Sequence, residues 1–509
     1  METYIKTIHL VNFRKFTDAT IAVNPGMNIF VGDNGAGKSS ILQAIDLALS
    51  GSATRVLSYG FDNLMNVETI EKWKTAPQLD TLPKTIVELI LEMPDSPKNQ
   101  YFHGEQHYGA TPTAAYGIKM VCEPNPDHVE ELAEAIRSGQ CSVFPFSFYI
   151  VSFSTFSNAS YTGFKKPVKS KFIDNTCTNT TKALRNIVTD TYQNALGKRE
   201  RAQNEHNFAL HLDQFSLPPM AKERGLVVSA ELEDLLDIRE SGISISNRGE
   251  GAINLAKTES TLVRDSGTSS VVIIEEPENH LSPVGLRKLV NYINRETVGR
   301  QLFIATHSSY IATRLGLRQV YFVADTVKSL QDLTDDTADF FMRAPNDNIL
   351  QFILAKKVIL VEGAAEYILM DKFILQTTGH SSDELGIWIL ALNNLSFQRY
   401  FELANKLGIK VAAIRDNDGK TCDWYRDRYR DFVDEAKKVF VDPDTARHTF
   451  EICLYNDNTS TLSKIFASQQ DPQAYMLANK AEAALLILKS NERLVVPLYI
   501  QEAIQWIAG

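Results

Sequence analysis

The sequence predicts an α/β protein built from two kinds of unit, and three observations support this class. A glycine-rich stretch, residues 31–40, lies between a short apolar run and a helical pattern. A second apolar run, residues 271–274, ends in two glutamates, and a third, residues 358–361, ends in another glutamate. Apolar runs that end in polar groups are typical of buried parallel strands, so we expect strands that alternate with helices.

Composition limits the class of protein. The chain has 509 residues, 44% of them apolar, which is ordinary for a globular protein of several domains. Its five cysteines are scattered without a Cys-x-x-Cys pair, which argues against a zinc cluster and favours a reducing compartment. We expect a cytoplasmic protein without membrane contact, because the apolar runs are too short to span a bilayer. The net charge of −10 excludes only a uniformly basic surface.

The glycine-rich stretch has the spacing of a phosphate-binding loop. Its glycines let backbone N–H groups face phosphate oxygens, and the helix that follows directs its positive end at the same anion. Lys38 is expected to reach the β- and γ-phosphates, and the Ser39 hydroxyl to bind Mg²⁺. We therefore predict ATP and Mg²⁺ as cofactors. The candidate nucleotide-binding residues here are Asn34, Gly35, Gly37, Lys38, Ser39 and Ser40.

Between this loop and residue 240 the pattern is mixed. A strand pair is expected near residues 5–16, with a turn at 12–16, and a further strand at 85–92. Two prolines in residues 122–127 predict a loop that leads to a helix at 128–138. A long polar helical stretch, residues 178–212, ends before Pro218 and is interpreted as an inserted arm.

Two later strand ends carry acids and a histidine. Glu275 and Glu276 follow an apolar run, which is the arrangement that delivers one carboxylate to Mg²⁺ and a second to the attacking water. Glu275 stands where an Asp is usual, and Glu276 is the candidate general base. His307 follows the apolar run 301–305 and is placed to sense a γ-phosphate. Residues 246–251 head a helical pattern, another helix N-terminus suited to an anion.

The last third repeats the pattern of acids after apolar strands. Glu362 ends the run 358–361, and Glu366 lies four residues on, across a turn that Gly363 permits. Asp416 and Asp418 follow the run 411–414 and are expected on one face of the strand end. Acids at the carboxyl ends of two parallel strands favour a site for Mg²⁺ or Mn²⁺.

Several motifs together resemble the ABC-type ATPase heads of SMC, RecF and OLD proteins. They are Phe13-Arg14, the loop at 32–39, residues 246–251, residues 275–281 and Thr306-His307. The resemblance implies that a signature loop of one subunit completes the nucleotide site of another, so we expect a homodimer or higher homo-oligomer. The signature residues that would contact the γ-phosphate in trans are Ser246, Arg248, Gly249 and Gly251. These residues depart from the usual Ser-Gly-Gly-Gln form of the signature. For a separate motif, the Q-loop, Asp62 is the nearest candidate.

Residues 351–509 resemble a Toprim domain, and the whole chain resembles the OLD (overcoming lysogenization defect) family of ATPase–nucleases. By this resemblance Glu451 is a third possible metal ligand, and a lysine, Lys480 or alternatively Lys489, neutralises charge on the scissile phosphate. Many OLD proteins act in prokaryotic anti-phage defence. Some are encoded with helicases and others with retron reverse transcriptases and their msDNA, so a partner of that kind is expected.

The resemblance implies four domains and a leading function. The expected domains are an ATPase N-terminal lobe at 1–177, a helical insert and dimerisation arm at 178–225, an ATPase C-terminal lobe at 226–345 and a Toprim domain at 346–509. The leading hypothesis is an ATP-controlled, metal-dependent endonuclease with DNA as substrate. The alternatives are a RecF-like ATPase scaffold whose Toprim domain is a docking module, and a primase- or topoisomerase-like enzyme.

Two stretches are candidates for nucleic-acid contact. Residues 419–438 interleave basic and aromatic residues, which suits phosphates and unpaired bases, but the same stretch holds four aspartates. A salt-bridged surface helix is therefore an equal interpretation. Lys165, Lys166, Lys169 and Lys171 form a second cluster, either a phosphate-contacting loop or a solvated one.

Overall fold

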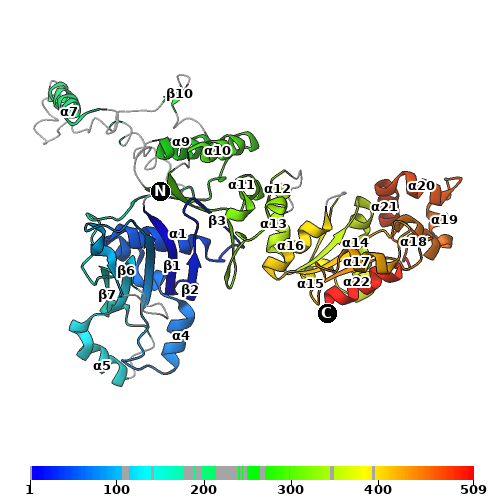
Figure 1. The fold of residues 1–509 in the computed structure, drawn as a ribbon, viewed down its shortest axis with the longest axis horizontal. Coiled ribbons are helices and arrows are strands. Elements are labelled where there is room, and N and C mark those ends of the chain that lie inside the picture. The colour runs from blue at the N-terminus through cyan, green and yellow to red at the C-terminus, as the bar shows by residue number, and fades with distance from the viewer. Residues whose placement is uncertain are drawn as a thin grey trace, which may run out of the picture. The chain divides into compact units, whose positions relative to one another are not determined.

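The computed structural model describes residues 3–105, 114–138, 143–176, 189, 192, 196–213, 239–240, 243–244, 249–263, 270–296, 299–343, 349–392 and 396–509. They form two compact units (Figure 1). The first comprises Met1–His307 and Val323–Val327, and the second comprises Ser308–Phe322 and Lys328–Gly509. The domain limits expected at residues 177, 225 and 345 stay predictions.

An antiparallel sheet opens the first unit. Its strands follow the order β2-β1-β4-β6-β5, and β7 also pairs with β6. Their bounds are β1 (Tyr4–Phe13), β2 (Phe16–Ala22), β4 (Thr85–Glu92), β5 (His103–Gly104), β6 (Ala115–Pro124) and β7 (Tyr149–Thr155). The predicted strand pair and the strand at 85–92 are confirmed. The predicted loop from Cys122 was wrong, because pairing with β7 continues β6 to Pro124.

A parallel sheet carries the glycine-rich loop. It includes, in spatial order, β3 (Met27–Val31), β12 (Arg300–Ala305), β11 (Ser270–Glu275) and β8 (Lys169–Asp174). The helix after the loop, α1 (Lys38–Ser50), contacts strands of both sheets, so most of its side chains are buried. The turn into α1 requires glycine at position 37, where φ is 110° and a Cβ would lie 2.8 Å from the Phe16 ring.

Gln301 joins the two sheets of this unit. Its side chain is fully buried, with Nε2 donating to the carbonyl oxygens of Ile5 and Asn24 at 2.7 Å each. Its Oε1 accepts from the Ile5 N–H at 2.8 Å, next to a register shift in β1 between Ile5 and Thr7. One side chain therefore pairs both backbone groups of Ile5 and shares the Asn24 carbonyl with the Asn28 amide, which donates to it at 3.0 Å.

Further elements surround the two sheets. The bounds are α2 (Ala53–Tyr59), α3 (Phe61–Leu64), α4 (Val67–Thr75), α5 (Val129–Arg137), α7 (Lys198–Asp213), α9 (Glu250–Val263), α10 (Pro283–Glu296), β9 (Arg239–Glu240) and β10 (Ile243–Ser244). The helix predicted at 128–138 is confirmed by α5. Within the predicted insert, α7 is a described helix, and residues 177–188 and 214–238 lie outside the described part of the chain.

The second unit is built on a four-stranded parallel sheet of order β16-β15-β17-β18. The strands are β15 (Lys357–Val361), β16 (Ile387–Ala391), β17 (Lys410–Ile414) and β18 (Lys437–Phe440). Both apolar strands predicted in the last third are therefore confirmed, and they are direct neighbours in the sheet. Because they are parallel, the acids that follow them lie at the same edge.

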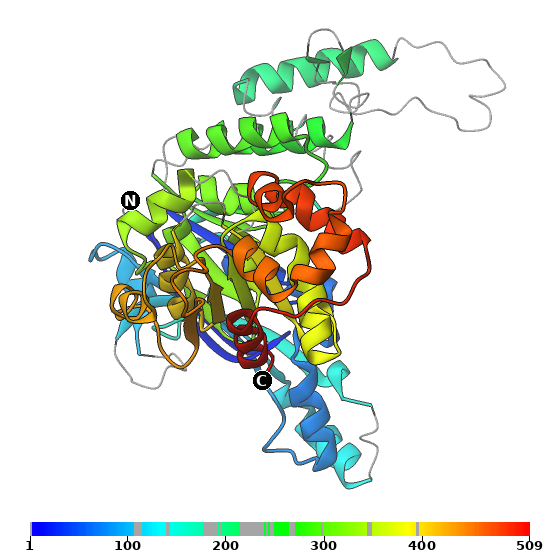
Figure 2. The ribbon, with the colours of Figure 1, turned by 90° about the vertical axis from the view of Figure 1, so that its right-hand side faces the viewer.

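Side chains of one sheet face form a core with the helix that follows β15 and with helices nearer the end of the chain. This core contains Ile359, Val361, Ala412 and Ile414, together with apolar residues of α14, α18, α21 and α22. Figure 2 shows the C-terminal helix α22 in front of the sheet, and α22 contacts β17. The other elements are α11 (Ser309–Arg314), β13 (Val320–Val323), β14 (Val327–Ser329), α12 (Asp335–Arg343), α13 (Ile349–Leu354), α14 (Ala364–Thr378), α15 (Ser382–Leu385), α16 (Phe397–Leu407), α17 (Cys422–Arg428), α18 (Phe450–Asp457), α19 (Thr459–Ile465), α20 (Pro472–Ala478), α21 (Lys480–Lys489) and α22 (Leu498–Ala508).

Membrane-spanning helices are absent from the described residues. None of the helices there combines the length and the apolar character needed to cross a bilayer.

Replacing Gln301 tests how the sheets are joined. Gln301→Ala removes the side-chain partner of both Ile5 backbone groups and one of two donors to the Asn24 carbonyl, so we expect the free energy of unfolding of the first unit to fall by ~2–5 kcal/mol. Urea denaturation followed by circular dichroism measures this change. Gln78→Ala, at an exposed position of the same unit, is the control and should leave the midpoint unchanged. A midpoint shift no larger than that of the control would contradict the joining role.

Candidate functional site

A cavity of about 250 Å³ lies at the carboxyl edge of the parallel sheet in the first unit. The sequence-predicted residues of the glycine-rich loop, both glutamates and the histidine all lie around it. Its lining is Arg14, Asn34, Gly35, Gly37, Lys38, Ser39, Ser40, Glu275, Glu276, Ala305 and His307. The arrangement places a cation, hydroxyl groups and two carboxylates around one space, which suits a phosphate with a bound cation.

Lys38 is held inside the loop by backbone carbonyls. Its Nζ donates to the carbonyl oxygens of Gly32 and Asp33, each at 2.9 Å, and the side chain is 5% exposed. Burial lowers the pKa of Lys38 below its ordinary value, although the nearby Glu276 and Asp33 favour the charged form. An ammonium has three N–H groups, so one remains for an anion in the cavity.

Glu275 lies against the start of α1. Burial raises the pKa of the Glu275 carboxyl, while a hydrogen bond with the Ser39 hydroxyl opposes the rise. Asp174, at the end of β8, is in register with Glu275 and adds to the raised pKa. Two carboxylates and a hydroxyl therefore meet here, and their oxygen atoms are ligands that Mg²⁺ prefers.

Glu276 and His307 face each other across the cavity. Their Oε1 and Nε2 atoms are 4.0 Å apart. Glu276 has a φ of 44°, a left-handed conformation that is strained for glutamate and persists when the surroundings impose it. Glu278 anchors the strand end that carries the histidine, because its Oε1 accepts from the His307 N–H at 2.7 Å and from the Thr306 hydroxyl at 2.6 Å. Burial raises the pKa of Glu278.

Two polar residues at this edge were missed from the sequence. Asp174 ends a strand whose sequence, Lys-Ser-Lys-Phe-Ile-Asp, is too polar to predict a buried position. Asn175 follows it, is 3% exposed, and has no hydrogen-bond partner for either side-chain amide atom among the described residues. Its backbone N–H donates to the Glu275 carbonyl at 3.3 Å. An amide with free bonding capacity beside Glu275 fits a bound nucleotide and its cation.

Arg14 was part of the motif resemblance but was not predicted as a site residue. It lines the cavity, and its backbone has a φ of 51°. Its backbone N–H donates to the Leu64 carbonyl at 2.8 Å. Burial lowers the pKa of Arg14, and Tyr59 and Glu275 oppose this shift. Asp62, the Q-loop candidate, lines a neighbouring cavity of about 720 Å³ that also contains Arg14.

The predicted signature loop is described only in part. Ser246 and Arg248 lie outside the described residues. Gly249 lies in open space, with no atom near the position of a Cβ among the described residues. A Cβ on Gly251 would lie 2.2 Å from the His280 carbonyl oxygen, so glycine at this position is required by packing. A role of these four residues in a neighbouring subunit stays a prediction.

The predicted acids of the second unit meet at one edge of its sheet. Glu362 follows β15, Glu366 lies in the first turn of α14, and Asp416 and Asp418 follow β17. Glu451 enters from the first turn of α18 and is 2% exposed. Across the turn at Gly363, Glu362 adds to the raised pKa of Glu366.

The buried acids raise one another's pKa, because each negative charge makes the next carboxylate harder to ionise. Burial raises the pKa of Asp416 to about 8, and Glu366, Glu362 and Glu451 add to the rise. Burial and Glu451 likewise raise the pKa of Glu366 to about 7. Burial raises the pKa of Glu362 as well, against the opposing effect of Arg415. Like charges at close range are relieved by a cation, so the cluster suits one electrostatically.

Two basic residues already contact the cluster. The Lys480 Nζ lies 3.0 Å from Glu451 Oε2, and Arg415 donates from Nε to Glu362. Burial alone would lower the pKa of Lys480, but Glu451, Asp416 and Glu366 raise it above the ordinary value. Lys489 lies at the opposite end of α21 with an exposed side chain. The structure thus brings Lys480 to the acids and leaves Lys489 away from them.

The ligand atoms of the cluster are chemically suited to a hard divalent cation. All five acids offer carboxylate oxygens, which Mg²⁺ and Mn²⁺ prefer, and no cysteine or histidine is among them. Among the described residues, no group of three or more Asp, Glu, His or Cys side chains is arranged as a preformed metal site. The residues that would hold a cation are therefore Glu362, Glu366, Asp416, Asp418 and Glu451, after side-chain adjustment.

The stretch 419–438 is largely salt-bridged. Arg426 pairs with Asp423 at 2.7 Å and Arg430 with Asp427 at 2.5 Å, but only residues 422–428 of the stretch are helical, so the surface-helix interpretation holds for that part alone. Tyr425 and Tyr429 are buried and stacked on each other, while Trp424 is 40% exposed beneath the Arg428 guanidinium. In the lysine cluster, Lys165 lies over the Tyr101 ring. Contact with nucleic acid at either stretch stays a prediction.

Family models match separate parts of the chain. A family described as "Overcoming lysogenization defect protein-like, TOPRIM domain" matches residues 353–418. Families described as AAA domains match residues 7–260 and 242–313. Residues 7–313 therefore match AAA domains and residues 353–418 match an OLD-like Toprim domain, which supports an ATPase–Toprim protein of the OLD type.

Individual relatives match shorter segments. A stretch of 52 residues is 44% identical to the DNA replication and repair protein RecF of Clostridium botulinum. This stretch makes up 10% of this chain and 14% of RecF. A stretch of 58 residues is 41% identical to RecF of Mesorhizobium japonicum, 11% of this chain and 15% of that protein. The chain therefore matches only a small part of the length of these curated relatives.

Solved structures are similar at low identity. An SMC head bound to the C-terminal winged-helix domain of ScpA is 13% identical, covers 64% of this chain and 99% of its own, and has a TM-score of 0.35. RecF bound to ATP is 13% identical over 65% and 99% of the two chains, with a TM-score of 0.33. The C-terminal region of the Xanthomonas campestris OLD protein is 20% identical. The match covers 30% of this chain and 92% of that region, with a TM-score of 0.24.

Variants of the first cavity test nucleotide binding. We expect Lys38→Ala to raise the Kd for ATP by about 100-fold, equal to the ~3 kcal/mol of one charge-assisted contact. Glu276→Gln should bind ATP normally but hydrolyse it about 100-fold more slowly or worse, because only the general base is lost. Isothermal titration and single-turnover hydrolysis measure the two effects. Lys74→Ala, on α4, is the control. Normal ATPase rates in Lys38→Ala would contradict the assignment.

Proposed function

We propose that the protein is an ATP-controlled, divalent-metal-dependent endonuclease of the OLD type that cleaves nucleic acid, DNA in the first place, in anti-phage defence. The observation that carries the proposal is the acidic cluster after β15 and β17, with Lys480 at its rim. We further propose Mg²⁺ as the cation, with Mn²⁺ as a substitute, and a cytoplasmic location.

The first cavity would bind ATP with Mg²⁺. Lys38 and the loop amides contact the phosphates, and Ser39 and Glu275 hold the cation. Glu276 accepts a proton from the attacking water, and His307, 4.0 Å from it, senses the γ-phosphate. In the proposal, ATP binding and hydrolysis control the nuclease.

The acidic cluster would cleave the phosphodiester. Divalent cations, when bound, stabilise the charge that develops on the attacking and leaving oxygens. Glu362, Glu366, Asp416, Asp418 and Glu451 hold the cations in place. The Lys480 ammonium lies at the rim of the cluster, where it offsets charge on the scissile phosphate.

Loss of one ligand carboxylate should stop cleavage. We expect Asp416→Ala and Glu362→Ala each to abolish nuclease activity and to leave ATP hydrolysis largely intact, because the two sites use different residues. Plasmid, single-stranded DNA and RNA incubated with Mg²⁺, Mn²⁺ or Ca²⁺ provide the measurement. Ca²⁺ should support cleavage poorly, since its coordination is looser. Asp423→Ala, an exposed acid of α17, should cleave normally.

A specific observation favours the alternative function, an ATPase scaffold of the RecF or SMC kind. Arg415 pairs with Glu362 and Lys480 with Glu451, so the protein itself supplies counter-ions to two of the five acids. In that case the Toprim domain docks a partner and holds no cation. Cleavage by Asp416→Ala at the wild-type rate would make this alternative the better one.

Assembly is part of the proposal. If Ser246, Arg248, Gly249 and Gly251 complete the nucleotide site of a neighbour, the active protein is at least a dimer, with the helical insert as a further contact. Light scattering at rising concentration, with and without ATP, measures the oligomeric state. A strict monomer with full ATPase activity would refute completion in trans.

By family resemblance, a helicase, or a retron reverse transcriptase with its msDNA, is the proposed partner.

A further inference from the structure

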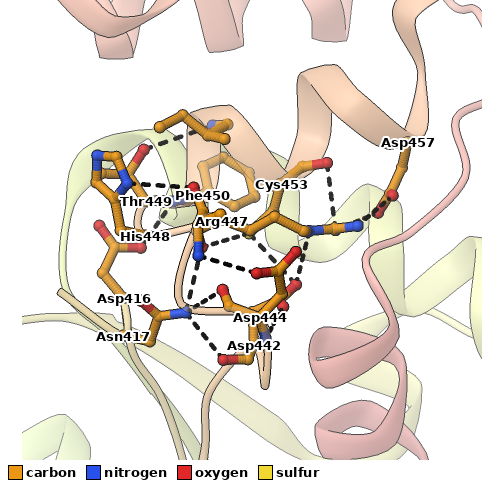
Figure 3. Close-up of polar contacts among 12 residues, drawn as sticks. Asp416, Asn417, Asp442, Asp444, Arg447, His448, Thr449, Phe450, Cys453 and Asp457 are labelled. Atoms are coloured by element: carbon orange, nitrogen blue, oxygen red, sulfur yellow. Dashed lines mark hydrogen bonds and ion pairs between the residues drawn. The ribbon is translucent and has the colours of Figure 1, made fainter. Parts of the chain in front are cut away.

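Asn417 lies between the two aspartates after β17 but faces the opposite way. It is 1% exposed, and its Nδ2 donates to the carbonyl oxygens of Asp442 at 2.9 Å, Asp444 at 2.8 Å and Arg447 at 3.3 Å. Its Oδ1 accepts from the Gly419 N–H at 2.9 Å. Figure 3 shows the Asn417 amide directed at residues 442–447. One side chain thus binds three carbonyls of a single loop, residues 442–449, called here the clamp loop.

Arg447 ties the clamp loop to the far end of α18. Its two terminal nitrogens donate to the two carboxylate oxygens of Asp457, each at 2.8 Å, and its Nε lies 3.0 Å from Asp442 Oδ2 (Figure 3). Asp457 is the last residue of α18 and Asp442 is the first of the loop. A two-point Arg–carboxylate contact fixes orientation as well as distance, so the loop is held at its start and against the helix that it leads into.

The held loop meets the acidic cluster directly. The N–H of Phe450, the first residue of α18 directly after the clamp loop, donates to Asp416 Oδ1 at 2.7 Å, which fixes the rotation of that carboxylate. The His448 carbonyl accepts from the Asp418 N–H at 3.3 Å. Glu451 is the second residue of α18, so the end of the clamp loop also sets where its carboxylate enters the cluster. Three of the five acids therefore depend on this loop.

We propose that Asn417 and Arg447 are positioning residues that set the metal affinity of the acidic cluster through the clamp loop. This inference rests on the proposed nuclease function and concerns the same site. Neither side chain contacts the cation; each fixes the backbone that orients Asp416, Asp418 and Glu451. Polar groups behind metal ligands typically change metal affinity by about 10–100-fold.

Mn²⁺ binding by the full chain without nucleotide tests the inference. Electron paramagnetic resonance of free Mn²⁺ gives the Kd, and Asp416→Ala defines the signal that belongs to this cluster. We expect Asn417→Ala to weaken Mn²⁺ binding by about 10–100-fold. Arg447→Lys keeps the charge but loses the two-point contact with Asp457, so it should weaken binding in the same direction. This second variant serves if Asn417→Ala does not fold.

Asn458, the residue that directly follows α18, offers a matched control. It is 5% exposed, its Nδ2 donates to the carbonyl oxygens of Leu454 at 3.0 Å and Val495 at 2.9 Å, and its Oδ1 accepts from the Val495 N–H at 2.7 Å. It therefore anchors a neighbouring segment as Asn417 does, but at the end of α18 away from Glu451. Asn458→Ala should lower the Tm as much as Asn417→Ala and leave the Mn²⁺ Kd unchanged.

The outcomes separate the inference from the proposed function. If the wild type and Asp416→Ala bind the same amount of Mn²⁺, the acidic cluster binds none. The proposed function then fails, and the inference fails with it. If wild type binds Mn²⁺ and Asn417→Ala binds it equally well, the inference alone is overturned. Equal weakening by Asn458→Ala would also overturn it, because affinity would then follow stability and not the clamp loop.

Discussion

The repulsion among buried carboxylates at the ends of parallel strands is the constraint on which much of this structure depends. Parallel strands bring their carboxyl ends to one edge, and both units place acids there: Glu275 beside Asp174 in the first, Glu362 beside Asp416 in the second. Taking such groups out of water while they face one another raises their pKa values. A fold that keeps them must supply opposite charge or hydrogen-bond donors.

The protein supplies both, from elements that are distant in sequence. In the second unit Arg415 and Lys480 pair with two of the acids, and the Phe450 N–H binds Asp416. In the first unit the Ser39 hydroxyl bonds Glu275, and Glu278 is held by Thr306 and the His307 backbone. These contacts leave the carboxylates ordered but still close together, which is the state that a divalent cation would complete.

Three residues at the same places have a strained backbone. Arg14, Glu276 and Asp418 have φ values of 51°, 44° and 47°, in a region that costs energy for residues with a side chain. Each lies at a candidate site in one of the two units. Such conformations persist when the surrounding contacts impose them, and at Asp418 the bond from its N–H to the clamp loop is one such contact.

Local patterns in the chain were enough for a large part of this description. The strand, glycine turn and helix around Lys38, and the apolar runs ending at Glu275, Glu362 and Asp416, are short-range signals, because each depends on neighbouring residues. They predicted the strands and the acids that the structure brings together. They failed where partners decide the outcome: β6 runs to Pro124 through its pairing with β7, and the polar stretch of β8 forms a strand through its pairing with β11.

The sequence by itself therefore determined most of the residues that line the candidate sites, since residue type and spacing are properties of the chain. Only the tertiary structure decided how they are held. It brought Lys480 and not Lys489 to the acids, placed Asp174 and Asn175 beside Glu275, and turned Asn417 away from its two neighbours onto a loop 25 to 30 residues later. Such contacts join segments far apart in the chain, and no local pattern encodes which segments will meet.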